Sequence, residues 1–159
     1  MEKIVRVSLS AALLEINMGQ DLESEGETLL DMESGEFIFL PNLLKDLVED
    51  EEPDDYPSCS SEEFAIARAC ADEPDRFVHV SSVESWQAYE WRDDFAKLLP
   101  AIYQKRILKA LDGPGAFARF NDCINDVSSL SKAWVVFEHR QMEEYLNSFV
   151  PRDVKIELI

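Results

Sequence analysis

The sequence predicts an α+β fold: a short antiparallel sheet that includes an N-terminal hairpin, packed on a helical C-terminal half. Two apolar runs, 27–32 and 36–40, flank a short stretch that ends in Gly35, and glycine there suits the left-handed backbone of a three-residue hairpin loop. From residue 83 almost to the end, apolar residues recur at steps of three and four, which indicates helices. The chain has 159 residues, so we expect one domain with a single core over 1–159.

Three further segments are expected to be strands of the same sheet. Residues 3–7 and 76–80 are short apolar-rich runs, and 154–159 alternates apolar and polar side chains as a half-buried strand does. We expect the first two to join the hairpin and the third to close the sheet.

Two capping signals predict helices in the N-terminal half. Ser8 directly precedes apolar residues at helical spacing, so a helix is expected to begin there. Ser60 and Glu63 have the spacing of a capping box, and the helix that they open must stop before Pro74. A short amphipathic helix is also expected over 43–48.

Prolines and glycines divide the helical half. Pro100 separates two helices or lies in the first turn of the second, the Gly113 to Gly115 turn ends the next helix, and Pro151 stops the last one. Each helix has an apolar face that we expect to be buried. These faces consist of Ala88, Trp91, Phe95, Leu98, Leu99 and Ile102, then Phe117, Phe120 and Ile124, then Trp134, Met142, Tyr145, Leu146 and Phe149.

The whole chain has a net charge of −18, and most of the negative charge lies in its N-terminal part. Residues 1–63 hold 18 Asp or Glu against three Lys or Arg, whereas 64–159 holds 15 against 12. Such a field repels phosphate backbones and anionic lipids, so we expect no direct binding of nucleic acid and no membrane attachment. A protein partner with a basic surface is expected instead.

The most acidic stretch is predicted to be a mobile loop at 49–58. Six of the seven residues in 49–55 are carboxylates, and Pro53 lies among them. Like charges repel, and the stretch has little to bury.

Cysteine usage and the N-terminus both favour the cytoplasm. Cys59, Cys70 and Cys123 are an odd number at wide spacing, which predicts reduced thiols and neither a disulfide framework nor a zinc knuckle. The first residues lack the basic and apolar regions of a signal peptide, and no run approaches the length of a membrane span.

Four stretches of the chain, which together span nearly its whole length, resemble the uncharacterised bacterial protein family 0158. The most specific part is 115–120, where a glycine turn leads into two phenylalanines three apart and an arginine. The stretches are Leu30-Asp31-Met32-Glu33-Ser34-Gly35-Glu36, Asp75-Arg76-Phe77, 110–122 and Trp134-Val135-Val136-Phe137 with the helix after it. The resemblance implies a small bacterial protein without an assigned reaction, so it bears on fold and compartment more than on function. The family usually has two arginines and a following lysine where Ala118, Arg119 and Asn121 stand, which argues against a basic anion-binding patch.

The glycine turn and the helix after it contain two candidate ligand-binding residues. Exposed amides at a helix N-terminus can hold an anion, but the fixed lysine and hydroxyl of a phosphate loop are missing, so a turn between two helices is the favoured interpretation. Arg119 and Asp122 are three residues apart and can form a solvated surface pair. A partly buried structural arginine is the second possibility, and a binding role is the third.

Two aromatic residues lie on a face that should be polar. Steps of three and four from Trp86 lead to Tyr89, Asp93 and Lys97, opposite the apolar face of the same helix. The favoured interpretation is that another element of the chain covers the rings. The alternative is a partner, because Trp and Tyr are favoured at interface hot spots. Trp86, Tyr89 and Asp93 are therefore the candidate partner-binding residues.

No catalytic, metal or cofactor motif is recognisable in the sequence. His79 and His139 have no metal-binding spacing, the acidic run lacks the pattern of a calcium loop, and no serine or cysteine stands in a nucleophile signature. We therefore expect no cofactor and no metal site, and nothing in the sequence argues for an enzyme.

Three functional hypotheses follow. We favour a non-enzymatic interaction or regulatory module whose acidic N-terminal half binds a basic protein partner. The first alternative is a small-molecule-binding domain or enzyme with a pocket near Arg76, Arg119 and Asp122, because the most distinctive string of the chain lies there. The second is a DNA-mimic inhibitor, which requires ordered carboxylates at phosphate-like spacing. The oligomeric state stays open.

Overall fold

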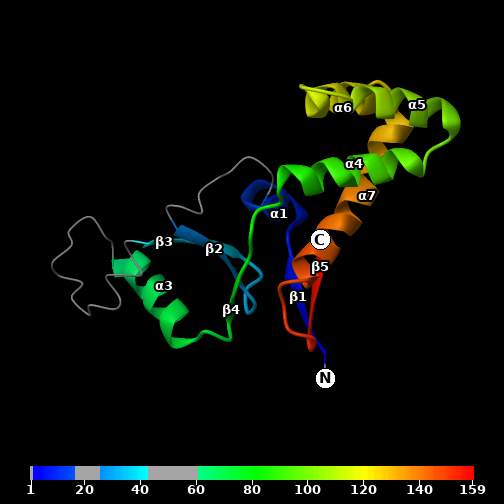
Figure 1. The fold of residues 1–159 in the computed structure, drawn as a ribbon. Coiled ribbons are helices and arrows are strands. Elements are labelled where there is room, and N and C mark those ends of the chain that lie inside the picture. Colours follow the sequence, from blue (N-terminus) through cyan, green and yellow to red (C-terminus); the bar gives the residue numbers. More distant parts are fainter. Residues whose placement is uncertain (1, 17–25, 43–60) are drawn as a thin grey trace. The chain divides into compact units, whose positions relative to one another are not determined.

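The computed structural model describes residues 2–16, 26–42 and 61–159 (Figure 1). They form two compact units, Met1–Ser82 together with Leu146–Ile159, and Val83–Tyr145. We call these the sheet unit and the helical unit. The predicted α+β class is confirmed, and the helices lie mainly in the C-terminal half. A single domain over 1–159 stays a prediction, and the helix expected over 43–48 and the acidic loop at 49–58 lie outside the described residues.

The sheet unit contains two sheets where the sequence predicted one (Figure 1). The antiparallel sheet has the order β3-β2-β4 and consists of β2 (Gly26–Asp31), β3 (Phe37–Pro41) and β4 (Phe77–His79). The outer strands β1 (Lys3–Val7) and β5 (Val154–Leu158) form a separate parallel pair. The expectation that β1 joins the hairpin and β5 closes the same sheet was wrong, because these two strands pair with each other over all five residues. The expectation that 76–80 joins the hairpin is confirmed, because β4 pairs with β2.

Local signals correctly predicted the hairpin and the first helix. Gly35 has φ +78°, the left-handed conformation expected of the loop between β2 and β3. A Cβ atom on this glycine would lie 2.0 Å from the carbonyl oxygen of Arg6, so the hairpin loop lies directly against β1. Helix α1 (Leu9–Glu15) begins after Ser8, whose side chain accepts a hydrogen bond from the Ala11 amide at 3.3 Å.

Helix α3 (Ser61–Asp72) packs on the antiparallel sheet. It ends two residues before Pro74, as expected for a residue that cannot continue a helix. A small core of four buried side chains joins the helix to all three strands. They are Leu29, Leu40, Ala67 and Phe77.

Asp31 is the buried carboxylate of the sheet unit, only 4% exposed. It accepts hydrogen bonds from Arg76 Nε at 3.0 Å, from Arg76 Nη2 at 2.9 Å, from the Ser34 hydroxyl at 3.0 Å and from the Glu33 amide at 2.9 Å. These bonds, above all those from Arg76, lower the pKa of Asp31 from 3.8 to about 2 although burial opposes the change. The carboxylate therefore fastens the hairpin loop to the segment that enters β4.

Acidification below the ordinary pKa of Asp31 is expected to destabilise the protein. The unfolded chain takes up a proton at this group near 3.8, whereas the folded state resists until about 2. The stabilisation, about 2 kcal/mol for a shift of this size, is therefore complete above the unfolded pKa and is lost as the pH falls toward the folded one. Urea unfolding at a series of pH values should show this loss in the native sequence and not in Asp31→Asn. Identical pH profiles for the two proteins would contradict it.

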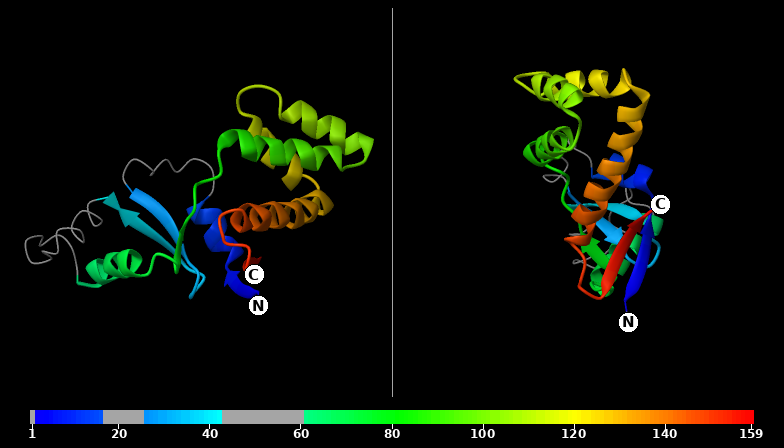
Figure 2. Two further views of the ribbon diagram at one scale, coloured as in Figure 1. Left: turned by 60° about the horizontal axis from the view of Figure 1, so that its bottom comes forward. Right: turned by 90° about the vertical axis from the view of Figure 1, so that its right-hand side faces the viewer.

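Four helices form the helical unit. They are α4 (Ser85–Lys97), α5 (Ala101–Ala110), α6 (Ala116–Asn125) and α7 (Ser128–Asn147), whose last two residues belong to the sheet unit. Helices α4 and α5 lie side by side, and α5 also contacts α6 (Figure 2). Pro100 occupies the N-cap of α5, and Gly113 and Gly115 both have φ +79° in the turn before α6. The predicted divisions of the helical half are confirmed.

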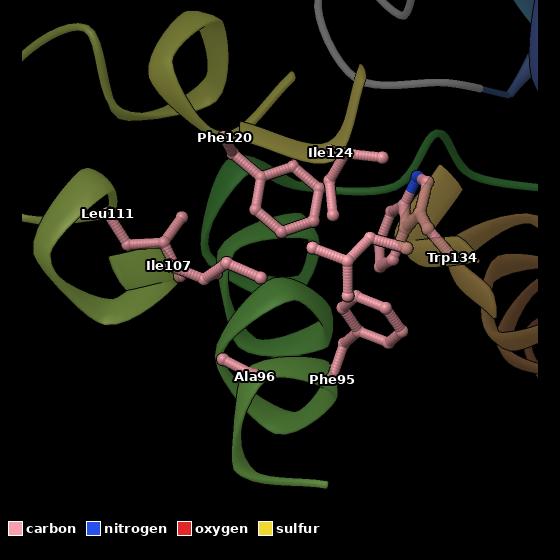
Figure 3. Close-up of a cluster of buried hydrophobic side chains, with 8 residues drawn as sticks. Phe95, Ala96, Ile107, Leu111, Phe120, Ile124 and Trp134 are labelled. Carbon is pink, nitrogen blue, oxygen red and sulfur yellow. The ribbon is translucent and has the colours of Figure 1, made fainter. Parts of the chain in front are cut away.

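An aromatic core holds these helices together (Figure 3). Phe120 is fully buried, and its ring meets those of Phe95 and Trp134 edge to face, with centroids 6.4 and 4.9 Å away. The buried residues of the cluster are Phe95, Ala96, Ile107, Leu111, Phe120, Ile124, Leu130 and Trp134.

Two residues of the predicted apolar faces are exposed. Leu98 is 73% exposed and Ile102 is 76% exposed, so the prediction that they are buried was wrong. Helix α4 ends at Lys97 and the next helix begins at Ala101. The change of direction between the two helices therefore ends the apolar face that the spacing seemed to extend.

Candidate aromatic pocket

Trp86 and Tyr89 lie together on the first turns of α4 and are both exposed. The exposed fraction is 60% for Trp86 and 40% for Tyr89. Within the helical unit, no described element covers the two rings in the way that the favoured interpretation expected. The alternative, a partner surface, therefore gains support. The start of α4 is well anchored, because the Gln87 side chain accepts from the Glu84 amide at 3.1 Å and Trp86 Nε1 donates to the Glu84 carboxylate.

The two aromatic side chains line an open pocket of about 430 Å³, the aromatic pocket. Helix α4 supplies one wall, and the turn between α5 and α6 supplies the other. The lining residues are Ser85, Trp86, Tyr89, Leu111, Gly113, Pro114, Gly115, Ala116 and Phe117. Their side chains are mainly apolar or aromatic, as is usual for a binding pocket.

Arg119 holds the wall that the turn provides. Its guanidinium donates to the carbonyl oxygens of Ala110 at 2.9 Å, Asp112 at 2.6 Å, Gly113 at 3.2 Å and Pro114 at 2.5 Å. These carbonyls belong to the end of α5 and to the turn, where they lack partners within a helix. Of the three possibilities for Arg119, the geometry supports the structural one.

Arg92 lies among three aromatic rings, one of which, Phe117, lines the pocket. Its guanidinium carbon is 4.6 Å from the ring centroid of Phe117 and 5.2 Å from those of Phe120 and Trp134. Nη1 donates to the Ala88 carbonyl at 2.9 Å, and Nε is buried without a hydrogen-bond partner among the described residues. Since Phe117 also lines the pocket, this cation helps to fix its ring.

Glu138 provides the opposite charge to Arg92. Burial lowers the pKa of Arg92 and raises the pKa of Glu138, and each charge opposes the shift of the other. A buried arginine is costly to desolvate, and the opposite charge of Glu138 offsets part of that cost.

Asp93, the third candidate partner-binding residue, does not line the pocket. Its carboxylate forms an ion pair with Lys97 at 2.6 Å, one turn along α4. The hydrogen bond from Asp93 raises the pKa of Lys97. Asp93 thus neutralises a neighbour on its own helix, and Trp86 and Tyr89 carry the case for a binding surface.

The candidate ligand-binding residues belong to different units. Arg76 lies in the sheet unit and pairs with Asp31 at 2.9 Å, with Glu33 at 2.8 Å and with Glu73 at 3.2 Å. Arg119 and the exposed Asp122 lie in the helical unit, and Arg119 donates to backbone carbonyls instead of to Asp122. Each arginine thus binds acceptors within its own unit.

The histidines and the described cysteines have ordinary surroundings. His79 Nδ1 lies 3.3 Å from a carboxylate oxygen of Glu27, and His139 Nε2 lies 3.5 Å from one of Glu143. Cys70 and Cys123 are free thiols, and burial raises the pKa of Cys70. Within 2–16, 26–42 and 61–159, no cluster of three His, Cys, Asp or Glu side chains could hold a metal ion.

Sequence reasoning missed the second wall of the pocket. Gly113 to Gly115 was interpreted as a turn between helices, which is correct, but its position beside Trp86 follows from the packing of α5 and α6. Arg92 was also missed. The available signal was an arginine six residues after Trp86 and three after Tyr89, on a helix whose buried face it borders.

The fold and the pocket define an α+β protein with an open aromatic pocket on its helical unit. No protein-family model, curated protein or solved structure matches the chain. In the part of the chain that the structure describes, the helices are too short or too polar to span a lipid bilayer.

Proposed function

We propose that this protein is a non-enzymatic interaction module that binds a basic protein partner through the aromatic pocket. The observation that carries the proposal is the joint exposure of Trp86 and Tyr89 on one open pocket. Large aromatic side chains gain most from being covered, and at interfaces they supply much of the binding energy at little entropic cost. A partner that covers both rings removes a large apolar surface from water.

Charge supports a basic partner. The exposed residues Glu84, Glu90 and Asp112 are sequence neighbours of pocket-lining residues, and the chain as a whole has a net charge of −18, most of it from residues 1–63. Opposite charges across an interface accelerate association and reject acidic competitors. As the compartment we propose the bacterial cytoplasm, in keeping with the resemblance to family 0158.

The two alternative functions have less support. A pocket near Arg76, Arg119 and Asp122 would need arginines with donors to spare, whereas both arginines bind acceptors of their own unit. A DNA mimic would present the carboxylates of 49–55, which lie outside the described residues.

Replacing Trp86 or Tyr89 by alanine is expected to weaken partner capture strongly. The full chain, immobilised at low salt, should retain a partner from bacterial lysate, and retention should fall at about 0.5 M salt, where surface charges are screened. Trp86→Ala and Tyr89→Ala should each weaken retention about tenfold or more, as hot-spot residues do. Mass spectrometry of the eluates measures both effects.

Leu98→Ala is the control, because Leu98 is a large, exposed apolar residue of the same unit that does not line the pocket. It should retain the partner fully. The proposal is contradicted if Trp86→Ala retains the partner as well as the native sequence does. It is also contradicted if retention of the partner is unchanged at high salt.

A further inference from the structure

We infer that the aromatic pocket recognises an extended, proline-rich segment with basic flanking residues. The inference rests on the proposed function and specifies the part of the partner that docks. Three properties of the pocket favour it: the spacing of the two aromatic side chains, the hydrogen-bond donors at its edge and the sign of the surrounding charge.

The aromatic wall offers exposed rings against which proline rings can pack. Trp86 and Tyr89 are three residues apart on α4, so they are neighbours on one helix face, and both line the pocket. Pro114 and Phe117 complete the apolar lining on the opposite wall. Polyproline II segments dock into aromatic-lined grooves of this kind, because their conformation is largely formed before binding and little entropy is lost.

The opposite wall offers donors to the backbone of such a segment. Helix α6 begins after Gly115, which has no side chain that could cap it. The first backbone N–H groups of a helix have no acceptor within the helix, and Ala116 and Phe117, which carry two of them, line the pocket. A polyproline II chain has no internal hydrogen bonds, so its carbonyl oxygens are free to accept.

The charges around the pocket favour basic flanks. Glu84 precedes the lining residue Ser85, Glu90 follows Tyr89, and Asp112 lies between Leu111 and Gly113. The nearby positive charge of Arg119 is directed to the carbonyls of the turn. Arginine or lysine beside the prolines would therefore meet carboxylates.

The same charges argue against the chain itself as the occupant. Its own prolines at 53 and 57 stand among carboxylates in the sequence, and a second copy would bring another net charge of −18. Both would be repelled by the carboxylates of Glu84, Glu90 and Asp112. A basic partner segment is the occupant that satisfies the lining, the donors and the charge together.

Three fluorescein-labelled peptides of equal length test the inference against the full-length protein. The first has a run of prolines between two arginines at each end. The second replaces the prolines by glycine and serine, and the third replaces the arginines by glutamate. Fluorescence anisotropy at low salt should show binding of the first peptide alone, and Trp86→Ala and Tyr89→Ala should each weaken it about tenfold or more.

Leu98→Ala should bind the first peptide as the native sequence does, and thermal unfolding should show that all variants are folded. If the glycine-serine peptide binds as tightly as the proline peptide and still depends on Trp86, the proline inference fails and the proposed function stands. If no peptide binds while Trp86-dependent, salt-sensitive capture of a partner persists, the inference fails alone. If neither peptide nor partner binding depends on Trp86, both fail.

Discussion

Gly35→Ala is expected to destabilise the protein by about 2–5 kcal/mol, the sum of a left-handed backbone penalty and a forced displacement of packed backbone. The glycine has φ +78°, which alanine adopts poorly. A new Cβ atom would also lie 2.0 Å from the Arg6 carbonyl oxygen, far inside van der Waals contact. Arg6 lies in β1, whose pairing with β5 resists movement, so the hairpin loop must shift instead. Urea unfolding followed by circular dichroism measures the loss.

Gly113→Ala is the matched control for this prediction. Gly113 has almost the same backbone conformation, with φ +79°, but a Cβ atom there would meet nothing within 4 Å. Only the conformational penalty remains, about 1–2 kcal/mol. The difference between the two variants isolates the contact between the hairpin loop and β1. Equal destabilisation would show that this close approach does not exist in solution.

Phe120→Ala is expected to cost about 3–5 kcal/mol, the usual range for removal of a buried phenylalanine. Phe120 is fully buried at the centre of the aromatic core (Figure 3), and its loss leaves Phe95 and Trp134 facing a void. It also removes one of the three rings around Arg92, whose charge is already poorly solvated. Chemical unfolding gives the free energy, and near-ultraviolet circular dichroism reports the tryptophan environment.

Val136→Ala serves as the control, because Val136 is an exposed apolar residue on α7 of the same unit. Its replacement should change the free energy of unfolding by less than about 0.5 kcal/mol, as for most surface substitutions. A small effect of Phe120→Ala, close to that of Val136→Ala, would mean that the helices do not pack as described.

Part of the candidate site could be predicted from the sequence. The spacing of Trp86 and Tyr89 placed both on the polar face of a helix, and the structure leaves them there, exposed. Whether a segment of the same chain covers them depends on side chains far away in the sequence, which the spacing alone does not reveal. Arg119 illustrates the same limit, since its four carbonyl acceptors come together only when the turn after α5 folds back.

Short-range physics explains the elements that were correctly predicted. A serine cap, a glycine in a left-handed loop and a proline that ends a helix act over a few residues, so α1, the hairpin and the helix boundaries can be derived from the residues themselves. The pairing of β1 with β5, the exposure of Leu98 and the second wall of the aromatic pocket depend on how distant segments meet. Hydrogen bonds between strands and burial between helices are gained only after that long-range closure, and no local pattern encodes its outcome.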